Sequence, residues 1–334
     1  MALRLDILDK KDNRGGLFAV EKASFIYGLI TLVLVFIFIG NAETMQKMIV
    51  SRGIIFGITI FLAFVFHYYP SKLMAFVRIG FQLSLLSYWY PETYEFNRLF
   101  QNLDHVFAGY EQHLFNSQPA LTFSANYPQA MVSEALNMGY FFYYPMMLVV
   151  CAYYFLAKFK GFEKVSFILI TSFFIYYFIY IFLPVSGPQF YFDVIGVDNA
   201  QKGIFPAIGN YFSENQFTML KAPGYEDGLF YKLVGQAQQA GERPTAAFPS
   251  SHIGVSTILM IMSWRGNKIM FALLLPLYLL LCGATVYIQA HYLIDGIAGV
   301  ISGFIIFYVA EAIYNRWFKV NVFYEETNSI MRRY

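Results

Sequence analysis

The sequence predicts an all-α protein, a polytopic bundle of transmembrane helices accompanied by helices that lie in the membrane interface. Of its 334 residues, 58% are apolar and only 13% are charged, a composition too apolar for a soluble domain. Aromatic residues make up 20% of the chain, which suits interfacial belts of Tyr and Trp. Apolar runs recur along the chain and are separated by polar segments. Together these observations define the fold class.

About six of the apolar runs are expected to form a core bundle, with extra spans at the N-terminal end. The expected spans are 24–40, 53–69, 73–90, 139–157, 165–183, 252–264, 269–288 and 292–314. The third contains Arg78, whose charge must pair or reach the interface. The sixth has 13 residues, short of the roughly 20 that cross a bilayer. Its start is therefore expected to be recessed, which would seat His252 in a cleft.

The polar segments divide the chain into regions. Residues 91–138 are aromatic yet hold several acids, a pattern that predicts amphipathic helices in the membrane interface. Residues 184–251 form a long polar segment, and a stretch of this length is expected to fold as an outer cap. The expected organisation is N-terminal spans and interfacial helices over 1–138, a catalytic transmembrane core over 139–314, and a cytoplasmic tail over 315–334.

The distribution of Lys and Arg predicts the orientation. With eight alternating spans and a cytoplasmic N-terminus, most basic residues fall in cytoplasmic segments, and both termini lie inside. The polar cap would then face the periplasm if the membrane is a bacterial inner membrane, or a lumen if the source is eukaryotic. The basic residues form no stripe, which argues against a nucleic-acid partner.

One candidate site begins where the cap meets the sixth span, in Pro249-Ser250-Ser251-His252. Hydroxyl residues before an apolar helical run mark a helix start, and the N–H groups at such a start favour an anion such as phosphate. Arg243 could clamp that anion through its planar guanidinium. Ser250 and Ser251 are candidate phosphate ligands, although both could simply cap the helix.

The second half of the candidate site is His291-Tyr292-Leu293-Ile294-Asp295. Residues at i and i+4 share one helix face, so Asp295 can orient the His291 ring. Two spans separate His252 from His291, which returns both histidines to the same side of the membrane. Two histidines, a carboxylate, an arginine and a helix start suit phosphoryl transfer. His105 and His113 lack tight ligand spacing, so no metal and no cofactor is expected.

These two motifs carry a family resemblance. Pro249-Ser250-Ser251-His252 resembles the PSGH signature, and His291 to Asp295 the HxxxD signature, of the type 2 phosphatidic acid phosphatase superfamily. The resemblance implies that His291 is a nucleophile that forms a phosphohistidine and that Asp295 orients it. It also implies that His252 protonates the leaving group and later acts as a base.

The chain departs from the phosphatases of that superfamily at two positions. Thr285 stands where they usually carry an arginine, six residues before the nucleophile, and Gln236 stands where their upstream lysine would be. The absence of an arginine at this position resembles the inositol phosphorylceramide synthase branch of the superfamily. Two further segments, Tyr88-Trp89-Tyr90-Pro91-Glu92-Thr93-Tyr94 and Ser186-Gly187-Pro188, also resemble that branch.

The resemblance to that branch implies that the protein is a metal-independent transferase of sphingolipid metabolism. It would move a phospho-headgroup, with phosphoinositol the leading expectation, from a glycerophospholipid to ceramide or a similar lipid alcohol. The alternative is a lipid phosphatase that uses water as the acceptor. A transporter is less favoured, because the polar residues cluster at one face and few charges fall at mid-membrane.

Overall fold

The computed structural model describes residues 16–216 and 218–318, and within them every regular element is a helix. The all-α prediction is confirmed. The helices are α1 (Ala19–Phe38), α2 (Ala42–Tyr68), α3 (Lys72–Ser84), α4 (Leu86–Asn97), α5 (Asp104–Phe115), α6 (Pro119–Asn126), α7 (Ala130–Phe141), α8 (Tyr143–Ala157), α9 (Phe159–Phe182), α10 (Pro188–Ile195), α11 (Val197–Gln201), the short 3-10 helix η1 (Tyr211–Ser213), α12 (Leu229–Gly241), α13 (Ser251–Gly266), α14 (Lys268–Tyr287) and α15 (Leu293–Trp317).

Five helices of the described chain are long and apolar enough to cross a membrane, namely α1, α2, α9, α14 and α15. A sixth span results if α7 and α8, which meet at an angle of 43°, are counted together. The expected continuous span at 73–90 is wrong, because α3 ends and α4 begins at Leu85. Helix α13 has 16 residues, three more than the expected span of 13, and is still short of the roughly 20 that cross a bilayer. The chain is thus a multi-pass membrane protein, and its orientation stays a prediction.

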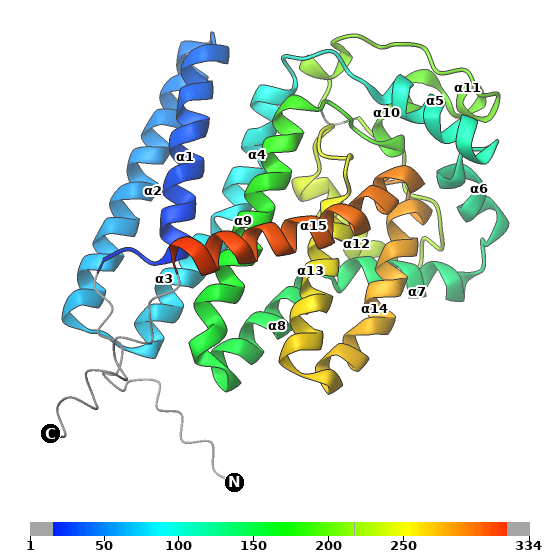
Figure 1. Cartoon of the computed structure of the whole chain (residues 1–334). Helices are drawn as coiled ribbons and strands as arrows, with labels where there is room; N and C mark the ends of the chain where they lie inside the picture. The colour runs from blue at the N-terminus through cyan, green and yellow to red at the C-terminus, as the bar shows by residue number, and fades with distance from the viewer. Residues whose placement is uncertain (1–15, 217, 319–334) are drawn as a thin grey trace, which may run out of the picture.

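Helix α9 forms the centre of the bundle and packs against α1, α4, α8, α13 and α15 (Figure 1). Its side chains are buried along almost the whole length of the helix, including Ile168, Leu169 and Tyr176. Burial on all sides explains why its sequence is apolar without an obvious polar face.

Two buried ion pairs fix the N-terminal helices to the bundle. Arg78 on α3 donates through Nε to Glu21 on α1 at 2.7 Å, and Arg52 on α2 donates to Glu92 on α4 at 2.7 Å. The predicted need of Arg78 for a partner is confirmed. Removing one member of such a pair would leave the other charge buried and uncompensated, which costs about 3–5 kcal/mol.

Helices α13 and α15 approach closely because glycines line their contact. A Cβ atom on Gly299 would lie 2.7 Å from the carbonyl oxygen of Ser250, and one on Gly303 would lie 2.6 Å from that of Gly254. Glycines with this spacing let two helices approach closely. The N–H of Ser250 donates to the carbonyl oxygen of Asp295 at 3.0 Å, so the starts of both helices meet at one end of the bundle.

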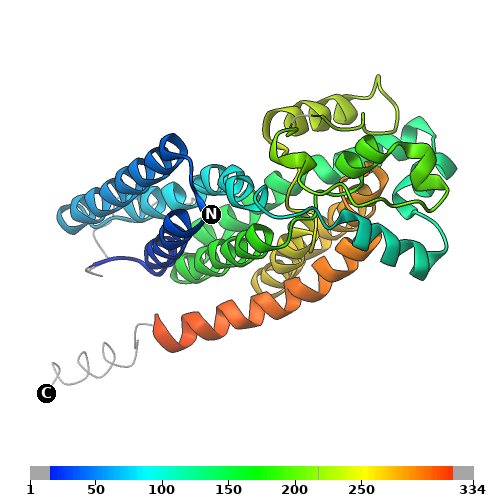
Figure 2. The ribbon, with the colours of Figure 1, turned by 90° about the horizontal axis from the view of Figure 1, so that it is seen from above.

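The short helices gather at that same end. Helices α5, α6, α10, α11 and α12 lie together beyond the starts of α13 and α15, at the opposite side of the molecule from α1 and α2 (Figures 1 and 2). Within the polar segment 184–251, α12 packs along α7 and α10 contacts α5. These helices surround the place where the two histidine motifs meet.

Candidate active site

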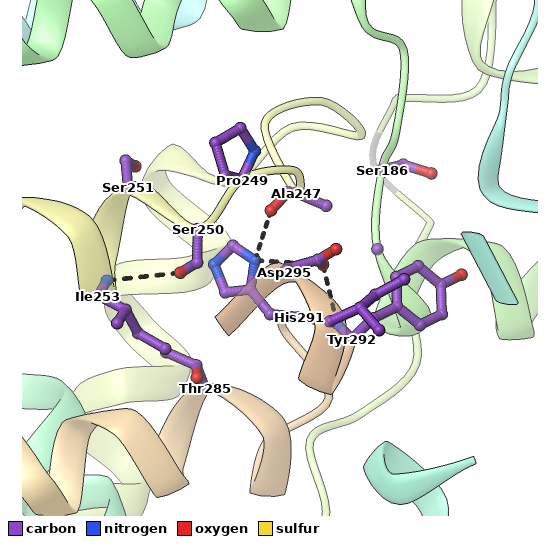
Figure 3. Close-up of polar contacts among 12 residues, drawn as sticks. Ser186, Ala247, Pro249, Ser250, Ser251, Ile253, Thr285, His291, Tyr292 and Asp295 are labelled. Atoms are coloured by element: carbon purple, nitrogen blue, oxygen red, sulfur yellow. Dashed lines mark hydrogen bonds and ion pairs between the residues drawn. The ribbon is translucent and has the colours of Figure 1, made fainter. Parts of the chain in front are cut away.

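His291 lies in the short connection between α14 and α15, and its side chain is 5% exposed. The ring atom Nδ1 lies 2.9 Å from the carbonyl oxygen of Ala247 and 3.6 Å from Oδ2 of Asp295 (Figure 3). A carbonyl oxygen only accepts, so Nδ1 carries the proton and donates it. The remaining nitrogen, Nε2, then presents its lone pair, as a nucleophile requires.

Asp295 is fully buried at the first turn of α15. Its Oδ2 accepts the backbone N–H of Tyr292 at 2.9 Å, while Oδ1 has no hydrogen-bond partner. The carboxyl group therefore holds the backbone next to His291 and lies beside Nδ1. The hydrogen bond that fixes the tautomer of His291 is accepted by the carbonyl oxygen of Ala247. The sequence did not reveal this contact.

His252 lies in the first turn of α13 and faces the same pocket as His291. The centroids of the two imidazole rings are 5.8 Å apart. Tyr140 and Tyr143, on α7 and α8, contact the His252 ring at centroid distances of 4.9 and 4.6 Å. The structure thus brings the two predicted histidines together, with one ring confined by aromatic side chains.

The start of α13 is already occupied by internal hydrogen bonds. Ser250 is the N-cap, and its hydroxyl oxygen accepts the N–H of Ile253 at 3.4 Å. The N–H of Ser251 donates to the hydroxyl of Tyr180 at 3.0 Å. Phosphate contact by Ser250 and Ser251 stays a prediction, and for their backbone N–H groups it requires exchange of existing bonds.

A small pocket joins the two histidines. Its volume is about 30 Å³, room for about two water molecules. Its polar lining comes from Ser186, Gln189, Glu242, Thr245, Ser251, His252 and His291. Arg243 is not among the lining residues, and its Nη1 donates to the carbonyl oxygen of Glu242 at 2.7 Å. Its assignment as a phosphate ligand therefore stays a prediction.

Burial sets the protonation state of the nucleophile. It lowers the pKa of His291 to about 4, against the opposing effects of the Glu242 carboxylate and the Ala247 carbonyl. Burial also raises the pKa of Glu242, while His291 and the hydroxyl of Tyr140 oppose that shift. His291 is therefore neutral near pH 7, which is the protonation state that a histidine nucleophile requires.

Asp104, at the start of α5, helps to hold the site in place, although the sequence did not single it out as functional. Its buried carboxylate accepts the N–H and hydroxyl of Ser186, the N–H of Gly187, the amide of Asn102 and the hydroxyl of Tyr292. It thus ties the loop before α10 to the residue that follows His291. Nothing near Asp104 in the sequence indicated this role.

Glu111 acts on the same helix start from the second half of α5. Its Oε2 accepts the N–H of Ile294 at 3.1 Å and so caps α15. Burial, together with the nearby Asp295 carboxyl group, raises the pKa of Glu111 to about 8. Asp104 and Glu111 together position the segment 291–295.

No three His, Cys, Asp or Glu side chains are placed to hold a metal ion in the described parts of the chain. His105 and His113 accordingly lie in no such group.

Comparison with known proteins places the chain in a family. Residues 107–309 match the family model of the PAP2 superfamily, a range that includes both histidine motifs and most of α5. No curated protein and no solved structure matches the chain significantly.

Proposed function

Because the chain belongs to the PAP2 superfamily, we propose that it moves a phospho-headgroup from a glycerophospholipid to ceramide or a similar lipid alcohol. Membership supports an activity of the lipid phosphatase or phosphotransferase type. The observation that carries the proposal is the neutral, buried His291, whose Nδ1 is held by Ala247 and which shares one pocket with His252. Phosphoinositol is the proposed headgroup.

In the first step, Nε2 of His291 attacks the phosphorus of the donor. The bond between phosphorus and the diacylglycerol oxygen breaks, and His252 gives its proton to that oxygen. Burial lowers the pKa of His252 to about 3 in the empty pocket, so this step requires the negative charge of the bound phosphate to raise that pKa and protonate the ring. The headgroup phosphate is then bonded to His291, whose ring carries positive charge. The Asp295 carboxylate beside Nδ1 and the carbonyl of Ala247 stabilise this charge.

In the second step, neutral His252 takes the proton of the acceptor hydroxyl. The acceptor oxygen attacks phosphorus, the bond to His291 breaks, and both histidines return to their starting states. The two steps balance without a metal ion or a cofactor.

A phosphatase is the second candidate function, since water could replace the lipid alcohol in the second step. The pocket favours this reading through its size, because it accommodates water in its present shape. The resemblance of Thr285 and of residues 88–94 to the synthase branch favours the transferase. A transporter has the weakest support, because the polar residues converge on one small pocket.

Purified protein in detergent, supplied with phosphatidylinositol and a fluorescent ceramide, tests the proposal. Thin-layer separation would follow the ceramide product together with released inositol phosphate and phosphate. The proposal expects a ceramide phospholipid with the wild type and none with His291→Ala. His113→Ala serves as the matched control, because His113 is exposed on α5 away from the pocket.

Released inositol phosphate or phosphate without a ceramide product would make the protein a phosphatase. Equal activity of the wild type and His291→Ala would overturn the proposal altogether.

A further inference from the structure

The proposed reaction assigns no role to the aromatic rings around His252. Tyr140 and Tyr143 flank Phe142, where α7 ends and α8 begins at an angle of 43°. The rings of Tyr140 and His252 stack, with their centroids 4.9 Å apart and an interplanar angle of 28°. The ring of Tyr143 is tilted by 51° against the His252 ring, at a centroid distance of 4.6 Å. The imidazole therefore lies against two tyrosine rings and over the face of one of them.

His252 differs from His291 in the contacts of its ring. Nδ1 of His291 donates to the carbonyl oxygen of Ala247. Within the described parts of the chain, the His252 ring makes no hydrogen bond, and its ring contacts are with Tyr140, Tyr143 and His291. Burial, together with the nearby His291, lowers the pKa of His252 to about 3. A protein group that favours the charged form of this ring would therefore assist the bound phosphate in protonating it.

We propose that Tyr140 and Tyr143 are positioning residues that favour the protonated form of His252 once a phosphate group is bound. The inference rests on the proposed function and assigns two further residues to its first step. A cation within about 6 Å of a tyrosine ring centroid is attracted by the negative face of the ring, more strongly where water is excluded. Both centroid distances fall within this range. The imidazolium takes its proton from solvent as the phosphate enters and passes it to the leaving oxygen.

The protonation of His252 also depends on other titratable groups on the elements that pack around the start of α13. These groups come from α4, α9, α14, α15 and the connecting segments, and they are Tyr90, Tyr180, Glu242, Tyr278, His291 and Asp295. Replacing Tyr140 or Tyr143 removes none of them, so a comparison of variants isolates the two rings. The hydroxyl of Tyr140 donates to Oε1 of Glu242 at 3.4 Å, and a phenylalanine variant separates the loss of this hydroxyl from the loss of the ring.

The test measures how phosphohistidine formation depends on pH in the purified full-length protein. A single turnover of phosphatidylinositol labelled in the headgroup phosphate is followed from about pH 5 to pH 9, because the alkaline limb of this step reports loss of the proton from His252. Tyr140→Leu and Tyr143→Leu are each expected to move the limb about one pH unit lower, since the imidazolium loses a ring face. Tyr140→Phe and Tyr143→Phe keep the ring face and are expected to retain the wild-type limb.

Tyr153→Leu is the matched control on α8. Tyr153 does not line the pocket, and its hydroxyl donates to the carbonyl oxygen of Gly266 at the far end of α13, so its replacement should leave the limb unchanged. An unchanged limb in both Tyr140→Leu and Tyr143→Leu, or an equal shift in the phenylalanine variants, would overturn the inference and leave the proposed function standing. A wild type that never carries the label on His291 would instead refute the proposed function.

If the leucine variants do not fold, a replacement with nearly the shape of the tyrosine ring decides. Pentafluorophenylalanine in place of Tyr140 keeps an aromatic ring but removes the negative potential from its face, so a cation is no longer attracted. The alkaline limb should then lie at lower pH than in Tyr140→Phe. An equal limb, or a limb at higher pH, would overturn the inference, because the ring would then act only by excluding water.

Discussion

The hydroxyl of Tyr292 donates a 3.0 Å hydrogen bond to Oδ1 of Asp104, across 188 positions of sequence. Tyr292 directly follows His291, and Asp104 begins α5. The same carboxylate accepts from the backbone of Ser186 and Gly187. The position of His291 therefore depends on α5, a helix that is remote from it in sequence.

Loss of this contact should reduce turnover without removing a reacting group. Tyr292→Phe leaves one acceptor of a buried carboxylate without its donor, a loss of about 1–3 kcal/mol. Asp104→Asn should cost more, because an amide cannot accept all of the bonds made by the carboxylate. Thermal unfolding and kcat for lipid turnover measure both effects. Asp198→Asn, an exposed substitution on α11, is the control, and equal behaviour of Asp104→Asn and this control would contradict the account.

Activity should persist in acid further than an ordinary histidine allows. Because burial lowers the pKa of His291 to about 4, the nucleophile stays neutral as the pH falls through 6.5 and becomes protonated near pH 4. The pH profile of kcat/KM measures this acid limb. Glu242→Gln should move the limb to still lower pH, because the carboxylate raises the pKa of His291. An acid limb set by His291 near pH 6.5 would be incompatible with a buried, neutral ring.

Stability should decline as the pH rises towards 8. The pKa of Glu111 is raised to about 8 in the folded protein, while the unfolded chain ionises near 4.5. Between these values the folded state binds more protons than the unfolded state, so the free energy of unfolding falls with rising pH. Glu111→Gln mimics the protonated form and should flatten this decline, as thermal unfolding at several pH values would show. A variant as pH-dependent as the wild type would argue against this role of Glu111.

Methyl groups at the α13–α15 contact should destabilise the fold. The Cβ atom of Gly303→Ala would lie 2.6 Å from the carbonyl oxygen of Gly254, and overpacking of this kind costs about 1–3 kcal/mol. Gly57→Ala on α2 is the matched control, since a Cβ atom there meets nothing within 4 Å. Unfolding measured in detergent should separate the two variants, and equal stability would show that the helices can move apart at little cost.

The helical class and the meeting of the two histidine motifs followed from local sequence signals. Apolar runs are long enough to read as helices, and each motif stands at the start of a helix, so an even number of crossings brings them together. The N-cap role of Ser250 could also be predicted from the sequence, because a serine before an apolar run is a local feature.

The contacts that hold the site residues in place could not be predicted from the sequence, because they join residues that are distant along the chain. Ala247 contributes a backbone carbonyl, whose direction depends on the loop around Ala246 with its φ of 74°. Asp104 and Glu111 reach the site from α5, and nothing near them in sequence indicates this. The expected contact of Arg243 with phosphate stays a prediction, and its Nη1 donates to the carbonyl oxygen of Glu242. The break at Leu85 likewise has no proline or glycine beside it to reveal it.

The covalent intermediate on His291 is the central claim, and trapping it is the most direct test. The purified protein would be mixed with phosphatidylinositol labelled in the headgroup phosphate, quenched within milliseconds at alkaline pH, and digested for mass spectrometry. The account predicts an acid-labile label on the peptide that contains His291, absent from His291→Ala and present in His113→Ala. A label that persists in His291→Ala, or turnover by the wild type with no labelled His291 peptide, would contradict it.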